Sequence, residues 1–218
     1  KSPAEWLRRM QKHADEGNAD EQVELGDTYR DGGVGLTKSL PRALQLYALA
    51  AAQGHAPAQH ALGCCHLEGD DDYETALLWY RRAAAQGYAV SAFNLGDTSH
   101  NGEGVAQSDE EAVKWYRLSA AQGYAEAFNT LGNCHMAGRG VAKDVFESIR
   151  NYKFAAARGH AGAVLMLEKG VALVLDRTLS PAVDPTCSPA ADLFDWFESQ
   201  PAPPPRTGSR PLFDWFES

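Results

Sequence analysis

Small apolar residues and turn residues alternate along the chain in a pattern that returns at a fixed interval. The stretch 79–96, WYRRAAAQGYAVSAFNLG, recurs closely at 115–132, in related form at 46–63 and more weakly at 151–168. Each copy reads as the Ala-rich end of one helix, a glycine turn, and a second helix of small residues. The glycines of these turns repeat every 33 to 36 residues. A period of this length indicates a stack of two-helix repeats.

Polar residues at the helix starts set the boundaries of the predicted elements. We call the helix after each glycine turn the A helix and the helix before it the B helix. A helices are expected at 19–31, 56–68, 89–101, 125–137 and 161–176. The B helices have aligned N-cap candidates, which are Ser2, Ser39, Asp72, Ser108 and Asp144. Glu5, Glu111 and Glu147 stand three residues after their caps, so we predict capping boxes there.

Each A helix carries a narrow apolar face with a glycine in it. In the third A helix this face falls at i, i+3, i+4 and i+7, in the residues Ala92, Leu95, Gly96 and Ser99. Glycine inside a helix costs about 1 kcal/mol relative to alanine, so we expect it to let the next helix approach closely. The same position holds Gly26, Gly63 and Gly132, while the B helices supply bulk through Tyr47, Tyr80, Tyr116 and Tyr152.

The opposite side of the A helices is the predicted recognition surface. By the same helical count it presents Asp27, Asn94, Asp97, Asn101 and Asn133. Further along the chain the charge becomes positive, at Arg139, Lys143 and Arg150. We expect these residues to contact a protein partner, with an ordinary solvated face as the alternative.

Composition and charge exclude several classes of partner. The 218 residues carry a net charge of −9, and 44% of them are hydrophobic. Binding to a phosphate backbone needs clustered Lys and Arg, so we expect no nucleic acid partner. No apolar run is long enough to span a bilayer, so we expect no membrane span. The chain begins at Lys1 rather than at a methionine, which leaves any upstream targeting segment open.

The cysteine pattern favours a reducing compartment. Cys64 and Cys65 are adjacent, and Cys134 lies two repeats beyond them, so disulfides among them are not expected. A cysteine is followed by a histidine at the same repeat position twice, at Cys65–His66 and at Cys134–His135. These two pairs are two repeats apart, too far to share a zinc ion. We therefore expect no metal and no cofactor.

Three glycine loops resemble phosphate cradles at first sight. They lie at 32–35, 102–105 and 138–141, and they follow helix ends rather than strands. None carries the lysine and hydroxyl residue of a phosphate-binding loop. We interpret them as helix caps and turns.

The predicted terminal A helix and the segment after it differ in composition from the repeats before them. Residues 161–176, AGAVLMLEKGVALVLD, lack the polar outer face that the end of a solenoid normally needs, so another chain, a further repeat or the tail should cover them. From Arg177 the chain is rich in Pro and Ser and is expected to be flexible. We thus divide the chain into a repeat domain, 1–176, and a tail, 177–218.

The tail contains the heptapeptide LFDWFES twice, at 193–199 and at 212–218. On a helical wheel its apolar side chains share one side and its acidic ones the other. Seven residues do not hold a helix in water, so we expect the motif to fold in the groove of a partner, with a duplicated or engineered tag that contacts nothing as the alternative. The predicted contact residues are Leu193, Phe194, Trp196 and Phe197 in the first copy and Leu212, Phe213, Trp215 and Phe216 in the second.

The pattern LGxxxxxGxGV followed by WYxxAAxxG resembles the Sel1-like repeat (SLR) family, a relative of tetratricopeptide repeats. It is carried by Leu95, Gly96, Gly102, Gly104, Val105, Trp115, Tyr116, Ala120, Ala121 and Gly123, and again by Leu131, Gly132, Gly138, Gly140 and Val141. The resemblance covers about residues 2–170 and implies an all-α, right-handed α/α solenoid of about four units with an extra N-terminal helix. His66, Ser99 and His135 occupy a place where the family usually has Tyr, which could leave a polar pocket.

The resemblance implies protein binding and assembly without catalysis. We therefore predict an adaptor or scaffold that binds proteins through the solenoid surface and the duplicated tail motif. The partner is a separate protein or a neighbouring copy of the chain, held through the motif and helix 161–176. Two alternatives stay open: a regulatory protein with an activation-type acidic and aromatic tail, and an enzyme that uses the concave face as its cleft.

Overall fold

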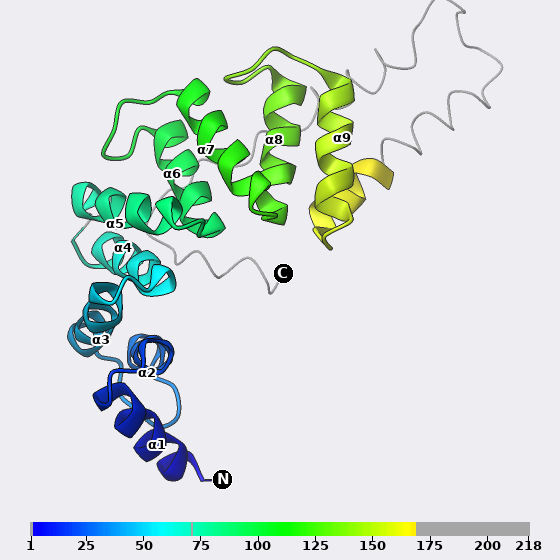
Figure 1. Cartoon of the computed structure of the whole chain (residues 1–218). Coiled ribbons are helices and arrows are strands. Elements are labelled where there is room, and N and C mark those ends of the chain that lie inside the picture. Colours follow the sequence, from blue (N-terminus) through cyan, green and yellow to red (C-terminus); the bar gives the residue numbers. More distant parts are fainter. Residues whose placement is uncertain (1, 71, 169–218) are drawn as a thin grey trace, which may run out of the picture. The chain divides into compact units, whose positions relative to one another are not determined.

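Helices account for all the regular structure in the part of the chain that the structure describes. This computed structural model describes residues 2–70 and 72–168 (Figure 1). The labelled helices are α1 (Pro3–Asp15), α2 (Ala19–Asp31), α3 (Leu40–Ala52), α4 (Ala56–Asp70), α5 (Tyr73–Ala85), α6 (Ala89–Asn101), α7 (Asp109–Ala121), α8 (Ala125–Ala137) and α9 (Val145–Ala156). Residues 161–168 are also helical. The predicted all-α architecture and the alternation of A and B helices are confirmed.

The N-caps show how each B helix is joined to the A helix before it. In α7 the Ser108 hydroxyl accepts from the amide of Glu111, as predicted. The amide of Ser108 itself donates to the carbonyl of Ser99 in α6, at 2.8 Å. Ser39, Asp72 and Asp144 repeat this link, with their amides bonded to the carbonyls of Tyr29, His66 and His135.

This link corrects two of the three predicted capping boxes. Only α1, which no A helix precedes in the described residues, forms the full reciprocal pair, between Ser2 and Glu5. In α7 and α9 the backbone amide of the N-cap residue already donates to the preceding A helix. Glu111 and Glu147 therefore form ion pairs with basic side chains one helical turn further along. Glu111 contacts Lys114 at 2.7 Å, and Glu147 contacts Arg150 at 3.0 Å.

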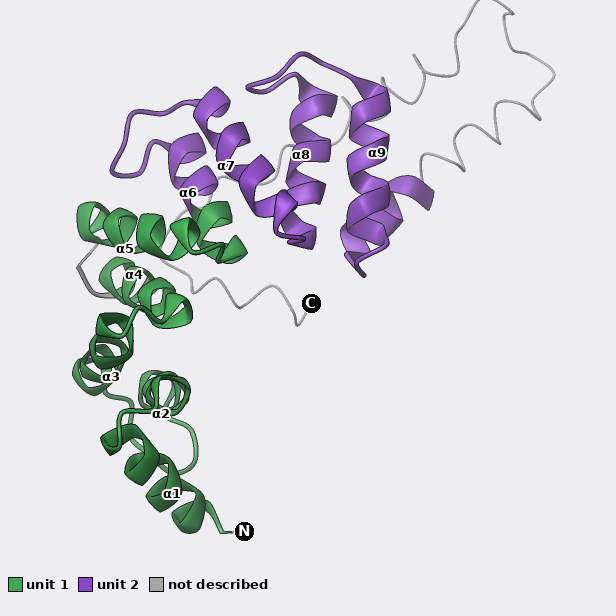
Figure 2. Ribbon diagram, viewed as in Figure 1, with its two compact units in different colours: residues 1–94, 208–218 green, residues 95–207 purple. Residues whose placement is uncertain are grey.

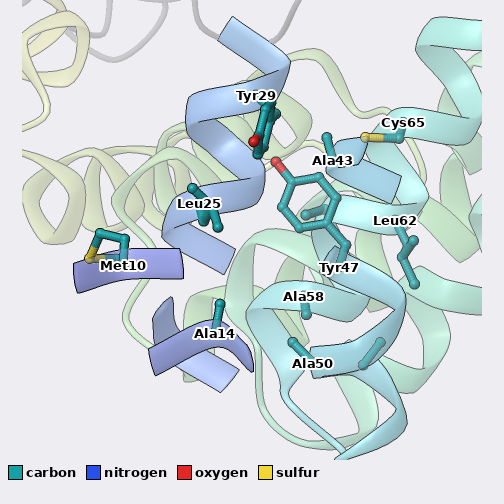
Figure 3. Packing of buried hydrophobic residues seen from close by; sticks show 12 residues of the cluster. Met10, Ala14, Leu25, Tyr29, Ala43, Tyr47, Ala50, Ala58, Leu62 and Cys65 are labelled. Atoms are coloured by element: carbon teal, nitrogen blue, oxygen red, sulfur yellow. The ribbon is translucent and has the colours of Figure 1, made fainter. Parts of the chain in front are cut away.

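The described residues fall into two compact units, up to Asn94 and from Leu95, with the boundary inside α6 (Figure 2). In the first unit, buried side chains from α1 to α4 form one hydrophobic cluster (Figure 3). Tyr47 lies in the middle of it, with Leu25 of α2 and Leu62 of α4 among its members. Because most other members are alanines, the cluster depends on close helix packing rather than on large side chains.

The helix glycines and the B-helix tyrosines form one contact, repeated four times. A Cβ atom added to Gly26 would lie 2.6 Å from Cε1 of Tyr47, and one on Gly63 would lie 2.5 Å from Cε1 of Tyr80. Carbon atoms do not approach so closely, so only glycine leaves room for the ring. Gly96 with Tyr116 and Gly132 with Tyr152 make the same contact. The predicted close approach is therefore confirmed, and its cause is a ring seated on each glycine.

The described part of the second unit ends in the helical residues 161–168. Ala163 is buried against Tyr152 and Ala155 of α9, which holds this segment to the last repeat. Val164 and Leu165 stay exposed, at 37% and 47%. The apolar surface expected on the terminal A helix is thus present as far as residue 168, and the remainder of the predicted helix, 169–176, lies outside the described residues. In the part that the structure covers, no helix is long and apolar enough to cross a membrane.

Candidate functional site

Three residues of the predicted recognition surface bind tyrosines of their own chain. The hydroxyl of Tyr47 donates to Asp27 at 2.6 Å, and that of Tyr116 donates to Asp97 at 2.9 Å. Asn133 accepts from Tyr152 at 2.7 Å. Each acceptor directly follows the glycine that seats the ring. These side chains therefore complete a buried tyrosine contact, and any role in binding a partner stays a prediction.

Burial suppresses ionisation of these tyrosines. Removal from water raises the pKa of Tyr152 to about 12, because the phenolate loses its hydration. Burial also raises the pKa of Tyr47 well above its ordinary value, and the hydrogen bond to Asp27 adds to this effect. The hydroxyls thus act as fixed donors at neutral pH.

The structure corrects the placement of Asn94. This residue is only 5% exposed, so the solvent-facing position that the helical count assigned to it is wrong. In the second repeat the acceptor position after Gly63 holds Cys64, whose Sγ lies 3.4 Å from the hydroxyl of Tyr80. Asn101 is exposed as predicted, and its amide donates to Glu103 at 3.2 Å.

The predicted basic residues divide between a loop and a helix. Arg139 and Lys143 are exposed in the connection between α8 and α9, and Arg150 is exposed on α9, where it pairs with Glu147. The predicted tail contacts lie outside the described residues; these are Leu193, Phe194, Trp196, Phe197, Leu212, Phe213, Trp215 and Phe216.

A pocket of about 480 Å³ lies between α7, α8 and α9, within the second unit. It has an apolar floor, a cationic rim and one histidine at its wall. The lining residues include Arg117 and Ala120 of α7, Phe128, Leu131 and His135 of α8, and Glu147, Arg150, Asn151 and Phe154 of α9. Of the residues expected to bind a partner, Arg150 alone is part of this lining.

Comparison between repeats explains the pocket. His135 follows Gly132 by three residues, and Tyr29 holds the equivalent place after Gly26. Tyr29 is buried, with the guanidinium of Arg42 over its ring at 5.3 Å and bonded to its hydroxyl at 3.0 Å. A histidine is smaller than a tyrosine and leaves this space open in the last repeat. The expected polar pocket is therefore present at His135.

Ser99 and His66, the other two residues that stand at this tyrosine position, each have a polar partner. The hydroxyl of Ser99 donates to the carbonyl of Leu95 at 2.8 Å, and His66 faces Asp72 at 3.6 Å. By contrast, Nδ1 of His135 is buried and has no hydrogen-bond partner among the described residues. A buried polar atom left in this state costs free energy.

The pocket has a positive rim over aromatic rings. Phe128 and Phe154 pack with ring centroids 5.4 Å apart, and the guanidinium of Arg158 lies 4.6 Å from the centre of the Phe128 ring. Arg117 is exposed and forms no ion pair with the residues that the structure describes. Since Glu147 is already paired with Arg150, Arg117 leaves the lining with excess positive charge, and Arg158 adds a further positive charge beside the two rings. This combination suits an acidic and aromatic ligand.

The other candidate chemistry has structural explanations. Gly32 and Gly138 end α2 and α8 in the left-handed conformation, with φ of 77° and 70°, so these loops are caps as expected. Cys65 and Cys134 are buried free thiols. Burial raises the pKa of the Cys65 thiol to about 12 and that of Cys134 to about 11, which disfavours a thiolate at neutral pH. Among the described residues no group of three or more His, Cys, Asp or Glu could hold a metal ion.

Comparison with known proteins follows the repeats. The Sel1 repeat family matches residues 22–55, 56–88, 89–124 and 129–160. A protective antigen of uropathogenic Escherichia coli strains, described as displaying an SLR fold, is 34% identical with a TM-score of 0.69, over 76% of this chain and 35% of that chain. A Sel1 repeat protein from Oxalobacter formigenes is 29% identical with a TM-score of 0.72, over 91% of this chain and 80% of that chain. This chain therefore spans about a third of the E. coli protein.

Proposed function

Because the chain belongs to the Sel1 repeat family, whose solenoids typically mediate protein–protein interactions and are generally non-enzymatic, we propose that it is a non-catalytic adaptor. The proposed binding domain is the solenoid, 1–176, and the tail, 177–218, supplies a second binding element. The observation that carries this proposal is the pocket between α7, α8 and α9, with its aromatic floor and cationic rim. Arg150 and the nearby basic residues Arg139 and Lys143 are the proposed partner contacts from this end of the solenoid.

The packing of the solenoid supports a binding role over a catalytic one. Asp27, Asp97 and Asn133 hold the buried tyrosines, so these polar side chains serve the stack itself. The buried thiols have raised pKa values, as described above. What the described surface offers instead is exposed apolar and cationic area, such as Phe154, which is 41% exposed beside Arg150. Aromatic and arginine side chains are the residue types that dominate binding energy at protein interfaces.

The duplicated motif LFDWFES is the proposed second element. Burial of each large side chain contributes about 1.5 to 3 kcal/mol, from which the ordering of the peptide must be subtracted. One copy therefore gives a weak site, and two copies gain strength through avidity. The proposed partner of the motif is a separate protein or the C-terminal end of a solenoid, either its own or that of a neighbouring copy of the chain.

Removal of both tail tryptophans tests this function. In the full chain, Trp196→Ala combined with Trp215→Ala should abolish tail-dependent association, because each motif loses its largest apolar side chain, and either change alone should only weaken it. The measurement is quantitative capture of proteins from an extract of the source cells on the immobilised chain, against a chain shortened at residue 176. Thr207→Ala with Ser209→Ala, between the two copies, is the matched control. Full retention of the captured proteins by the double tryptophan variant would disprove the role of the motif.

A further inference from the structure

We propose that the pocket between α7, α8 and α9 binds the LFDWFES motif of the same chain, so that the tail closes onto the last repeat. The inference rests on the proposed function, because it takes the motif to be a binding element and identifies where on the solenoid it docks. One tryptophan of the motif enters the pocket, and the acidic residues of the motif meet the arginine rim. The tail then competes with any external segment of similar chemistry.

The first argument is the fit of a tryptophan to the pocket. A volume of about 480 Å³ accommodates a large aromatic side chain, and the floor offers the rings of Phe128 and Phe154 for packing. The wall holds Nδ1 of His135, buried and without a partner among the described residues. Tryptophan is the largest side chain of the motif, so Trp196 buries the most apolar surface when its ring enters this pocket.

The second argument is charge complementarity. Arg117 is exposed and has no ion-pair partner in the described part of the chain. The guanidinium of Arg158 lies over the π faces of Phe128 and Phe154 and donates to the carbonyl of Phe154. The motif carries Asp195 and Glu198 on the side of the helical wheel opposite its aromatic residues. With the aromatic side in the pocket, these carboxylates face the rim. Arginine and carboxylate groups then form charge-assisted hydrogen bonds.

The third argument is the length of the chain between pocket and motif. The described residues end at Glu168, in the segment whose Ala163 belongs to the same cluster that Phe128 packs against. The first motif begins 25 residues later, at Leu193. A chain of that length can reach about 80 Å, which is ample for a return to the same unit. A tether of this kind gives an effective concentration of about 1 mM, so even a weak site is occupied.

The repeats themselves provide the variant that tests the site. Tyr29 fills the place in the first repeat that His135 holds in the last, so His135→Tyr introduces a residue that the fold already accepts at an equivalent position. The new ring should fill the pocket. His66→Tyr is the matched control, because it makes the same change at the equivalent position of the second repeat, in the other unit. Arg117→Glu serves as a second variant that reverses the charge of the rim at an exposed side chain.

The experiment measures binding of a fluorescein-labelled peptide of residues 191–200 to the full chain by fluorescence anisotropy. The reference protein is the full chain with Trp196→Ala and Trp215→Ala, whose own motifs are disabled. On this background His135→Tyr and Arg117→Glu should each weaken peptide binding at least about tenfold, whereas His66→Tyr should leave it unchanged. The chain with both motifs intact should bind the peptide about tenfold more weakly than the reference, as expected for a site of about 0.1 mM facing a tether of about 1 mM.

Several results would overturn the proposal. Equal peptide binding with and without His135→Tyr, in a variant that keeps its helical circular dichroism, would place the motif elsewhere. Equal binding by the intact chain and the reference would show that the tail does not occupy the pocket. Competition that appears only at concentrations where dimers form would assign the tail to a neighbouring copy. Failure of the peptide to bind the reference chain, with tail-dependent capture of another protein retained, would refute this inference and leave the adaptor function standing.

Discussion

Replacement of Gly96 by leucine should lower the free energy of unfolding by about 3 kcal/mol, near the upper end of the range for overpacked cores. A Cβ atom at this position would lie 2.5 Å from Cδ1 of Tyr116, and its contact with Cε1 would be closer still. The ring cannot withdraw easily, because it is buried and its hydroxyl is bonded to Asp97. Chemical denaturation followed by circular dichroism measures the loss.

A double-mutant cycle isolates the cause of that loss. Tyr116→Ala alone should cost about 3 to 5 kcal/mol, as other deletions of a buried aromatic ring do. Gly96→Leu should then be much less damaging in the Tyr116→Ala background, since the leucine occupies space that the ring has left. A coupling energy of about 1 to 3 kcal/mol between the two changes is expected. Additive effects would mean that the leucine disturbs something other than this ring.

Acid should destabilise the first unit through His60. Burial, with a smaller contribution from the charge of Arg30, lowers the pKa of His60 from 6.5 to about 4. The imidazole is largely enclosed on α4, with Nδ1 3.0 Å from Oγ of Ser91 and the rings of Tyr80 and Tyr88 beside it. A protonated ring would lose its hydration there without gaining a carboxylate partner.

The pH window follows from these two pKa values. In the unfolded chain His60 binds a proton near pH 6.5, whereas in the folded chain it does so only near pH 4, so the unfolded state is favoured as the pH falls between them. The stability contribution is complete above pH 6.5 and lost toward pH 4, by up to about 3 kcal/mol. Denaturation at pH 7, 6, 5 and 4 should show this decline, and His60→Gln should flatten it. An equally steep decline in the His60→Gln protein would assign the acid sensitivity to other groups.

The helices could be predicted from the sequence because their signals are local. N-cap residues, turn glycines and the spacing of small residues act within one or two turns of a helix, and the structure places α2, α6 and α8 at the predicted residues. The capping boxes at Ser108 and Asp144 were mispredicted for the opposite reason. Whether a cap amide is available depends on the preceding helix, which sequence spacing does not show.

The candidate site was harder to predict because it depends on contacts between helices. A helical wheel places Asp27 and Asp97 away from the apolar face, but it does not show how far a tyrosine from the next helix extends across that face. The hydroxyls of Tyr47 and Tyr116 reach these carboxylates and partly bury them. Asn94 is enclosed for the same general reason, since a solenoid buries more than one side of each A helix.

Comparison of the repeats with one another would have located the pocket. In the first repeat Gln53 bonds to Gln22 at 3.0 Å, and the equivalent places in the last repeat hold Arg158 and Phe128, which stack instead. Two of these departures, Phe128 and His135, line one cavity, and Arg158 stacks on the Phe128 ring beside it. A site in a repeat protein is thus marked by what one unit changes relative to its neighbours. Comparison of the repeats does not single out Arg139 and Lys143, so their expected contact with a protein partner stays a prediction.

The seating of a tyrosine on a glycine has a consequence for how such a chain can grow. Each pair, such as Gly26 with Tyr47, lies within one matched segment, 22–55, so a duplicated unit brings both halves of its own contact. Units can therefore be copied or deleted by recombination without a compensating mutation elsewhere. Glu168 stands where a fifth unit would need its glycine. Growth by another unit of the same kind at this helix would first require a substitution at Glu168, so the contact that lets interior units be exchanged also restrains growth at this helix.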